Sequence, residues 1–127
     1  MNPDEIMRLL QAAAVLFTLA ALGGLVMAGI RFSGRRNPPA WLAMLHGLLA
    51  GAGVTLLAYA WYAGDIPALA LLALLLFLLA AAGGAVLSLA YKWKQRLLPA
   101  SLVIGHAVAA VAAYVLLLVA VFGDVSA

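Results

Sequence analysis

Two histidines are the side chains in this sequence best suited to chemistry. His46 and His106 are its only histidines, and each lies seven residues after a proline, Pro39 or Pro99, inside an apolar stretch. An imidazole within a bilayer is costly and rarely faces lipid, so such a residue indicates a site with a partner. No nucleophile–base pair, phosphate-binding loop or carboxylate pair accompanies them. We therefore do not expect catalysis by side chains.

The composition indicates that the histidines lie in a membrane protein. Of the 127 residues, 69% are hydrophobic and 9% are charged, whereas a soluble domain has about 25% charged residues. Four apolar stretches each exceed the ~20 residues that a spanning helix needs. They are approximately residues 4–31, 39–62, 66–91 and 99–122. Because the connections are short, we predict an all-α membrane protein with an up-down-up-down four-helix transmembrane bundle.

The predicted helix starts carry the residues that favour helix initiation. All five prolines lie at or just before these starts, where the missing N–H group costs nothing. They are Pro3, Pro38, Pro39, Pro67 and Pro99. Asn2, Asn37 and Asp65 stand beside them, and we expect these three residues to cap the helices.

The basic residues predict the orientation. Six of the seven lie in the segments 31–36 and 92–96, while the other connection and the carboxyl-terminal tail carry only Asp65 and Asp124. By the positive-inside rule both basic loops face the cytoplasm and both termini lie outside. We expect a location in the bacterial inner membrane, with the termini on the periplasmic side. The basic residues lie in short loops beside the membrane, so we expect lipid contact and no nucleic-acid partner.

An internal repeat relates the two halves of the chain. A shift of 60 residues aligns them without a gap and gives 21 identities over 67 positions, against roughly eight or nine expected from the composition. The identities include His46 with His106, and they extend beyond alanine and leucine. We therefore predict one transmembrane domain, residues 1–127, built from two helical hairpins of about 1–62 and 63–127. An approximate two-fold axis along the membrane normal relates the hairpins.

The predicted bundle places the two histidines opposite each other. The second and fourth helices are diagonal, and each histidine lies about 10 Å from the start of its helix. The double glycines Gly23-Gly24 and Gly83-Gly84 fall on the other two helices at the same depth. Glycine leaves space for a neighbouring helix or a flat ligand. Two opposed imidazoles flanked by such space suit a haem b with His46 and His106 as axial iron ligands.

Two alternatives to haem remain open for this pair. Both histidines could be neutral and hydrogen-bonded, with the glycines serving only helix packing. Copper or zinc could bind instead, although no carboxylate or other third ligand lies within either helix.

The arrangement resembles small membrane b-type cytochromes, including the cytochrome b561-like bundles. Such proteins hold haem between histidines on transmembrane helices, with glycines where the ring meets a flanking helix. The resemblance is carried by the two histidines and the four glycines, and it covers all four helices. Transmembrane electron carriers of this kind usually have four histidines and two haems, whereas this chain has two histidines. This departure from the family pattern implies one haem, so we do not expect a complete electron path across the membrane.

These observations lead to a functional expectation. We expect a single-haem electron-transfer protein, rather than an enzyme with its own substrate. It would move single electrons between the quinone pool or a partner subunit and an acceptor or donor on the cytoplasmic side. The competing class of protein is a non-enzymatic assembly or accessory subunit of the membrane. The sequence leaves open whether the protein forms a homodimer. Haem propionates are anions, so we expect them to face the basic loops, with Arg36 and Arg96 as the preferred partners.

Overall fold

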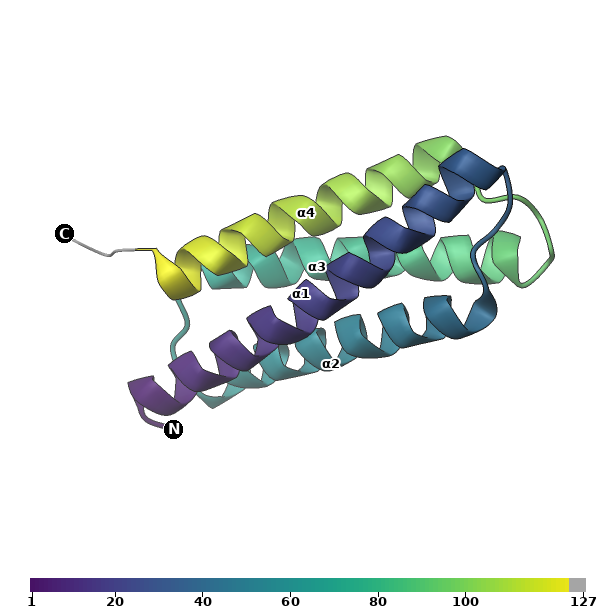
Figure 1. Cartoon of the computed structure of the whole chain (residues 1–127). Coiled ribbons are helices and arrows are strands. Elements are labelled where there is room, and N and C mark those ends of the chain that lie inside the picture. The colour runs from purple at the N-terminus through teal and green to yellow at the C-terminus, as the bar shows by residue number, and fades with distance from the viewer. Residues whose placement is uncertain (124–127) are drawn as a thin grey trace.

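A computed structural model describes residues 1–123 as an antiparallel bundle of four helices (Figure 1). Asp124 lies outside the described residues. The helices are α1 (Pro3–Gly34), α2 (Ala40–Ala63), α3 (Ala68–Val86) and α4 (Ala100–Phe122), and a π-helical segment, η1 (Leu87–Lys92), continues α3. Each of the four is long and apolar enough to cross a membrane. The predicted all-α transmembrane bundle is confirmed.

The chain termini and the basic loops lie at opposite ends of the bundle. Figure 1 shows the amino terminus and the end of α4 together at one end, which we call the terminal end. The loop between α1 and α2 and the loop between η1 and α4 lie together at the other end, the loop end. The up-down-up-down path of the chain produces this separation, because each helix reverses the direction of the one before it.

The helix starts use the predicted prolines but only one of the predicted side-chain caps. Asn2 accepts a hydrogen bond from the Glu5 backbone N–H and forms a capping box with the Glu5 side chain. The other three helices begin directly after a proline, and no side chain caps them. The capping roles expected for Asn37 and Asp65 were therefore wrong. Proline itself occupies the capping position in each case, and it has no side-chain acceptor.

The end of α1 differs from the boundary expected from hydropathy. α1 continues to Gly34 instead of ending near residue 31, and it stops where Arg35 takes a left-handed conformation with φ 49°. Gln95, the repeat equivalent of Arg35, has φ 54°. Both loops therefore turn at the same position of the repeat. The helix that includes α3 ends at Lys92, close to the expected residue 91, but its last turns are the π-helical turns of η1.

Packing is closest within each hairpin. α1 packs mainly on α2, and α3 packs mainly on α4, with smaller contacts between α1 and α4 and between α2 and α3. α1 and α3 are diagonal, yet the Phe17 and Phe77 rings reach across the centre and stack with their centroids 3.7 Å apart and their planes 3° from parallel. These phenylalanines are repeat equivalents. The approximate two-fold axis thus passes between them.

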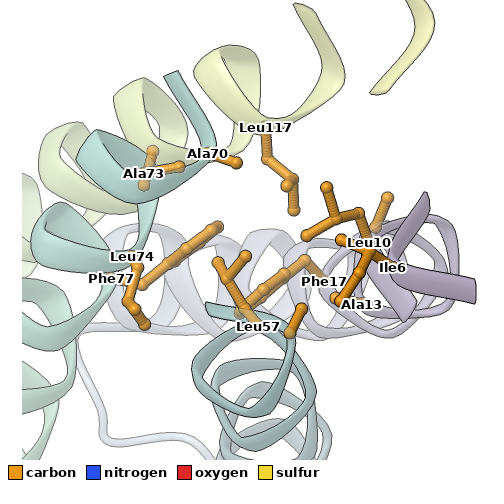
Figure 2. Close-up of a cluster of buried hydrophobic side chains, with 13 residues drawn as sticks. Ile6, Leu10, Ala13, Phe17, Leu57, Ala70, Ala73, Leu74, Phe77 and Leu117 are labelled. Atoms are coloured by element: carbon orange, nitrogen blue, oxygen red, sulfur yellow. The ribbon is translucent and has the colours of Figure 1, made fainter. Parts of the chain in front are cut away.

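The tightly packed core occupies the half of the bundle nearer the terminal end (Figure 2). Its members include the repeat pairs Ala13 with Ala73, Phe17 with Phe77 and Leu57 with Leu117. Elsewhere large apolar side chains face outward; Leu25 and Leu48, for example, are 69% and 70% exposed. Lipid tails solvate such a surface without the cost that water would impose. The histidines lie between this core and the loop end.

Candidate functional site: a histidine pair flanked by glycines

The structure brings the two histidines together at the centre of the bundle. His46 on α2 and His106 on α4 are both half-buried, and their ring centroids are 6.2 Å apart with an angle of 72° between the ring planes. α2 and α4 are the second diagonal pair, so the imidazoles meet across the two-fold axis as the phenylalanines do. Helix packing therefore brings the two histidines to one level of the bundle.

Each imidazole is held by a backbone carbonyl of its own hairpin. The Nδ1 atom of His46 lies 2.7 Å from the Ala20 carbonyl oxygen, and Nδ1 of His106 lies 2.7 Å from the Ala80 carbonyl oxygen. A carbonyl oxygen only accepts hydrogen bonds, so Nδ1 must carry the proton and donate. In the neutral ring Nε2 then keeps its lone pair. A second-shell bond of this kind fixes both tautomer and ring orientation in metal-ligating histidines.

The double glycines lie against these imidazoles. A Cβ atom added at Gly24 would be 3.2 Å from Cε1 of His46, and one added at Gly84 would be 3.2 Å from Cε1 of His106. At Gly23 and Gly83 the nearest atoms would lie at 3.8 Å and 3.7 Å, which is ordinary contact. A methyl group at Gly24 or Gly84 would therefore require the imidazole to shift by a few tenths of an ångström, whereas one at Gly23 or Gly83 would not.

This arrangement assigns the glycines a role that the sequence did not reveal. We expected them to border a flat ligand, and the nearest side chains to all four are the histidines of the same hairpin. The two carbonyl acceptors, at Ala20 and Ala80, were also missed. Ala20 and Ala80 are 60 residues apart, as the repeat requires, and this spacing was the one available signal. The residue type gave none, because the side chain of an alanine does not show what its backbone oxygen binds.

The site offers imidazoles and no other metal ligand. Within residues 1–123, no group of three or more histidine, cysteine, aspartate or glutamate side chains is arranged to hold a metal ion. Structural zinc sites have four protein ligands, and catalytic zinc sites have three. A metal held by these two imidazoles alone would have to bring its remaining ligands with it.

The arginines expected to meet the propionates lie in exposed loop positions. Arg36 and Arg96 are both exposed, and the Arg96 guanidinium lies 5.0 Å from the centroid of the Tyr91 ring. Two other cations at the same end are half-buried. The Nε–H of Arg31 donates to the Leu98 carbonyl at 2.7 Å, and the Lys92 ammonium donates to the Pro38 carbonyl.

The π-helical segment explains why these two cations are not aligned in the sequence repeat. Pro38 and Leu98 are 60 residues apart, as the repeat requires, whereas Arg31 and Lys92 are 61 apart. A π-helical turn holds about one residue more than an α-helical turn. η1 therefore absorbs one extra residue and brings Lys92 to the place that Arg31 occupies in the first hairpin.

Asn37 completes a hydrogen-bonded connection between the two loops at this end. Its side-chain amide donates to the Arg96 carbonyl at 2.7 Å, and its side-chain oxygen accepts from the Leu98 N–H at 3.0 Å. Together with Arg31 and Lys92, Asn37 ties the first loop to the second. We call these three residues the loop latch.

Comparisons with protein-family models, with curated proteins and with solved structures gave no match.

Proposed function

We propose that this protein is a membrane b-type cytochrome that binds one haem b through His46 and His106 and carries single electrons. The observation that carries the proposal is the pair of opposed imidazoles, each with Nδ1 donating to a carbonyl and Nε2 left as the basic nitrogen. Nearly all histidine ligands of metals have such a second-shell partner.

The spacing of the rings supports the proposal. If one nitrogen of each ring held the same metal at about 2 Å, with ~1.1 Å from each nitrogen to its ring centre, the centroids would lie about 6 Å apart. The observed separation is 6.2 Å. The angle of 72° between the ring planes would not prevent His46 and His106 from holding the same metal. The four glycines have no side chains, so the two imidazoles can lie directly against α1 and α3 at this depth.

The chain's own residues would set the properties of the iron. Haem, when bound, supplies an iron atom that gains or loses one electron. The Ala20 and Ala80 carbonyls hold both imidazoles in the tautomer that presents Nε2, and they increase the basicity of that nitrogen. His46 and His106 would both hold the iron and would leave no open position for oxygen. The apolar helices keep water from the site, and Arg31 and Lys92 bring positive charge to the loop end.

The donor or acceptor would be reached at the end nearer the site. We assign the loop end to the cytoplasm of a bacterial inner membrane, because six of the seven basic residues lie there. The electron partner on that side is a protein or small acceptor, and the other partner is the quinone pool or a neighbouring subunit.

A visible spectrum tests haem binding. Protein purified after expression with adequate haem should show a Soret band and, on reduction, the sharp α band of a six-coordinate low-spin haem. His46→Ala and His106→Ala should each remove the band or leave a five-coordinate remnant, and added imidazole should restore the six-coordinate spectrum. Met44→Ala, two residues away on the exposed side of α2, is the matched control and should keep the wild-type spectrum.

A colourless but folded wild-type protein would refute haem binding. That outcome would favour the alternative of an assembly or accessory subunit. The alternative also has a structural basis, because each imidazole already has a hydrogen-bond partner within the protein.

Cysteine labelling in intact cells tests the orientation. Cysteines at Ser33 and Gln95, both at the loop end, should be protected from an impermeant thiol reagent, while a cysteine at Gly64 should react. The chain has no cysteine of its own, so no background is expected. The opposite pattern would place the histidines near the outer face of the membrane and reverse our assignment.

A further inference from the structure

A basic groove at the loop end separates the carboxyl end of α1 from the amino end of α4. Its volume is about 430 Å³, and it is lined by Arg31, Phe32, Arg35, Leu97 and Ala100. Two of these residues are cations and two have large apolar side chains. The groove therefore offers positive charge beside an apolar wall, at the level where a helix end meets lipid headgroups.

Arg31 is held in place, Arg35 is exposed, and neither cation has an acidic partner in the described part of the chain. Arg31 is fixed by its bond to the Leu98 carbonyl, and its guanidinium lies 5.5 Å from the centroid of the Phe32 ring. Among residues 1–123 every acidic side chain belongs to the terminal end, at Asp4, Glu5 and Asp65. The protein therefore supplies no carboxylate to balance Arg31 and Arg35.

The partial charges of the helix ends do not balance these arginines either. The carboxyl end of α1 contributes about half a negative charge, and the amino end of α4 contributes about half a positive charge. These two contributions largely cancel, while the two guanidinium groups carry one full charge each. The groove thus keeps a net charge of about +2 and favours an anion.

The corresponding end of the second hairpin is related but not identical. η1 brings Lys92 to the place that Arg31 occupies in the first hairpin, and Lys92 donates to the Pro38 carbonyl. The sequence repeat aligns Arg35 with the uncharged Gln95, while Arg96 lies against the Tyr91 ring. The α1–α4 groove places Arg31 and Arg35 beside Phe32 and Leu97.

We propose that this groove binds a phosphate anion, supplied by the headgroup of an anionic phospholipid. Arginine presents a planar fork of N–H donors that matches phosphate oxygens and remains charged at all relevant pH values. Basic pockets between helices at the cytoplasmic side of a membrane bind lipid headgroups for this reason. Phe32 and Leu97 contact the glycerol and upper acyl part of the same lipid. This site is separate from the histidine pair.

Lipid titration of the delipidated, full-length protein in a nonionic detergent tests the proposal. Phosphatidylglycerol, phosphatidylcholine and inorganic phosphate are the three probes, and native mass spectrometry counts the bound molecules. We expect one phosphatidylglycerol site, about tenfold tighter than phosphatidylcholine. Arg31→Gln and Arg35→Gln should each weaken it about tenfold, as expected for loss of a charged hydrogen bond. Arg35→Gln is the decisive variant, because Arg31 also belongs to the loop latch.

Arg36→Gln and Lys94→Gln are the matched controls, because they remove the same charge from exposed positions at the same end. They should change the affinity less than twofold. An equal loss in all four variants would refute the groove and leave only diffuse attraction to the basic loops. Displacement of phosphatidylglycerol by inorganic phosphate at ~1 mM would support the phosphate site and overturn the lipid as its source.

Discussion

Replacing the glycines one at a time separates the residue that accommodates an imidazole from its neighbour. In Gly24→Ala the new methyl group would lie 3.2 Å from Cε1 of His46, which is tighter than ordinary contact. In Gly23→Ala it would lie 3.8 Å from the nearest atom of the same histidine, and nothing has to move. The two variants add the same methyl group to adjacent positions of one helix, so each controls for the other.

The expected effect follows from what the ring must do. A shift of a few tenths of an ångström moves the imidazole away from α1 and strains the 2.7 Å bond between Nδ1 and the Ala20 carbonyl. Loss of such a second-shell partner lowers metal affinity about 10–100-fold. Because the bond is strained and not removed, we expect Gly24→Ala to weaken haem binding about tenfold, near 1.4 kcal/mol. Gly23→Ala should stay within about twofold.

The assay pairs haem titration, followed at the Soret band, with thermal unfolding of the same samples. Alanine is about 1 kcal/mol better than glycine inside a helix, so neither variant should lose stability while haem affinity separates them. Gly84→Ala and Gly83→Ala provide a second, independent copy of the comparison, with distances of 3.2 Å and 3.7 Å. Equal haem affinities for Gly23→Ala and Gly24→Ala would show that the contact with His46 does not control the site.

Two further predictions concern the core and the loop latch. Gly53→Ala would place a methyl group 2.9 Å from the Phe17 ring, which is already stacked on Phe77. We expect this variant to lose about 1–3 kcal/mol in unfolding free energy. Gly51→Ala is the control: its methyl group would have no neighbour within 4 Å, and we expect no loss. Asn37→Ala should lower the unfolding free energy by about 1–2 kcal/mol, because it leaves the Leu98 N–H without its partner. Equal unfolding free energies for Gly53→Ala and Gly51→Ala would contradict the first expectation. An unchanged rate of loop proteolysis in Asn37→Ala would contradict the second.

The parts of this structure that were predictable follow from side-chain chemistry repeated along the chain. Long apolar stretches bounded by proline define the four helices, because only a helix satisfies every backbone group within a bilayer. The 60-residue repeat then fixes the opposition of His46 and His106, since equivalent positions of two equivalent hairpins must share one depth. Neither step requires knowledge of side-chain packing.

The parts that were not predictable depend on the backbone and on helix register. The carbonyl at Ala20 has no signature in the sequence, because every residue carries the same acceptor. Lys92, and not the repeat-aligned Tyr91, occupies the place that corresponds to Arg31, because a π-helical turn shifts the register by one residue. No proline or glycine within Leu87–Lys92 indicates that turn. The basic loops were correctly recognised as a group, but which cation turns inward depends on such single-residue shifts.

The carbonyl bond within each hairpin has a consequence for how the chain enters the membrane. His46 finds its partner on the helix synthesised just before its own, so the first hairpin can leave the translocon with its imidazole already hydrogen-bonded. The second hairpin repeats this with His106 and Ala80. Neither hairpin therefore exposes an imidazole without a hydrogen-bond partner to lipid while the other hairpin is still absent. A chain divided near Gly64 should still insert into the membrane as two separate hairpins.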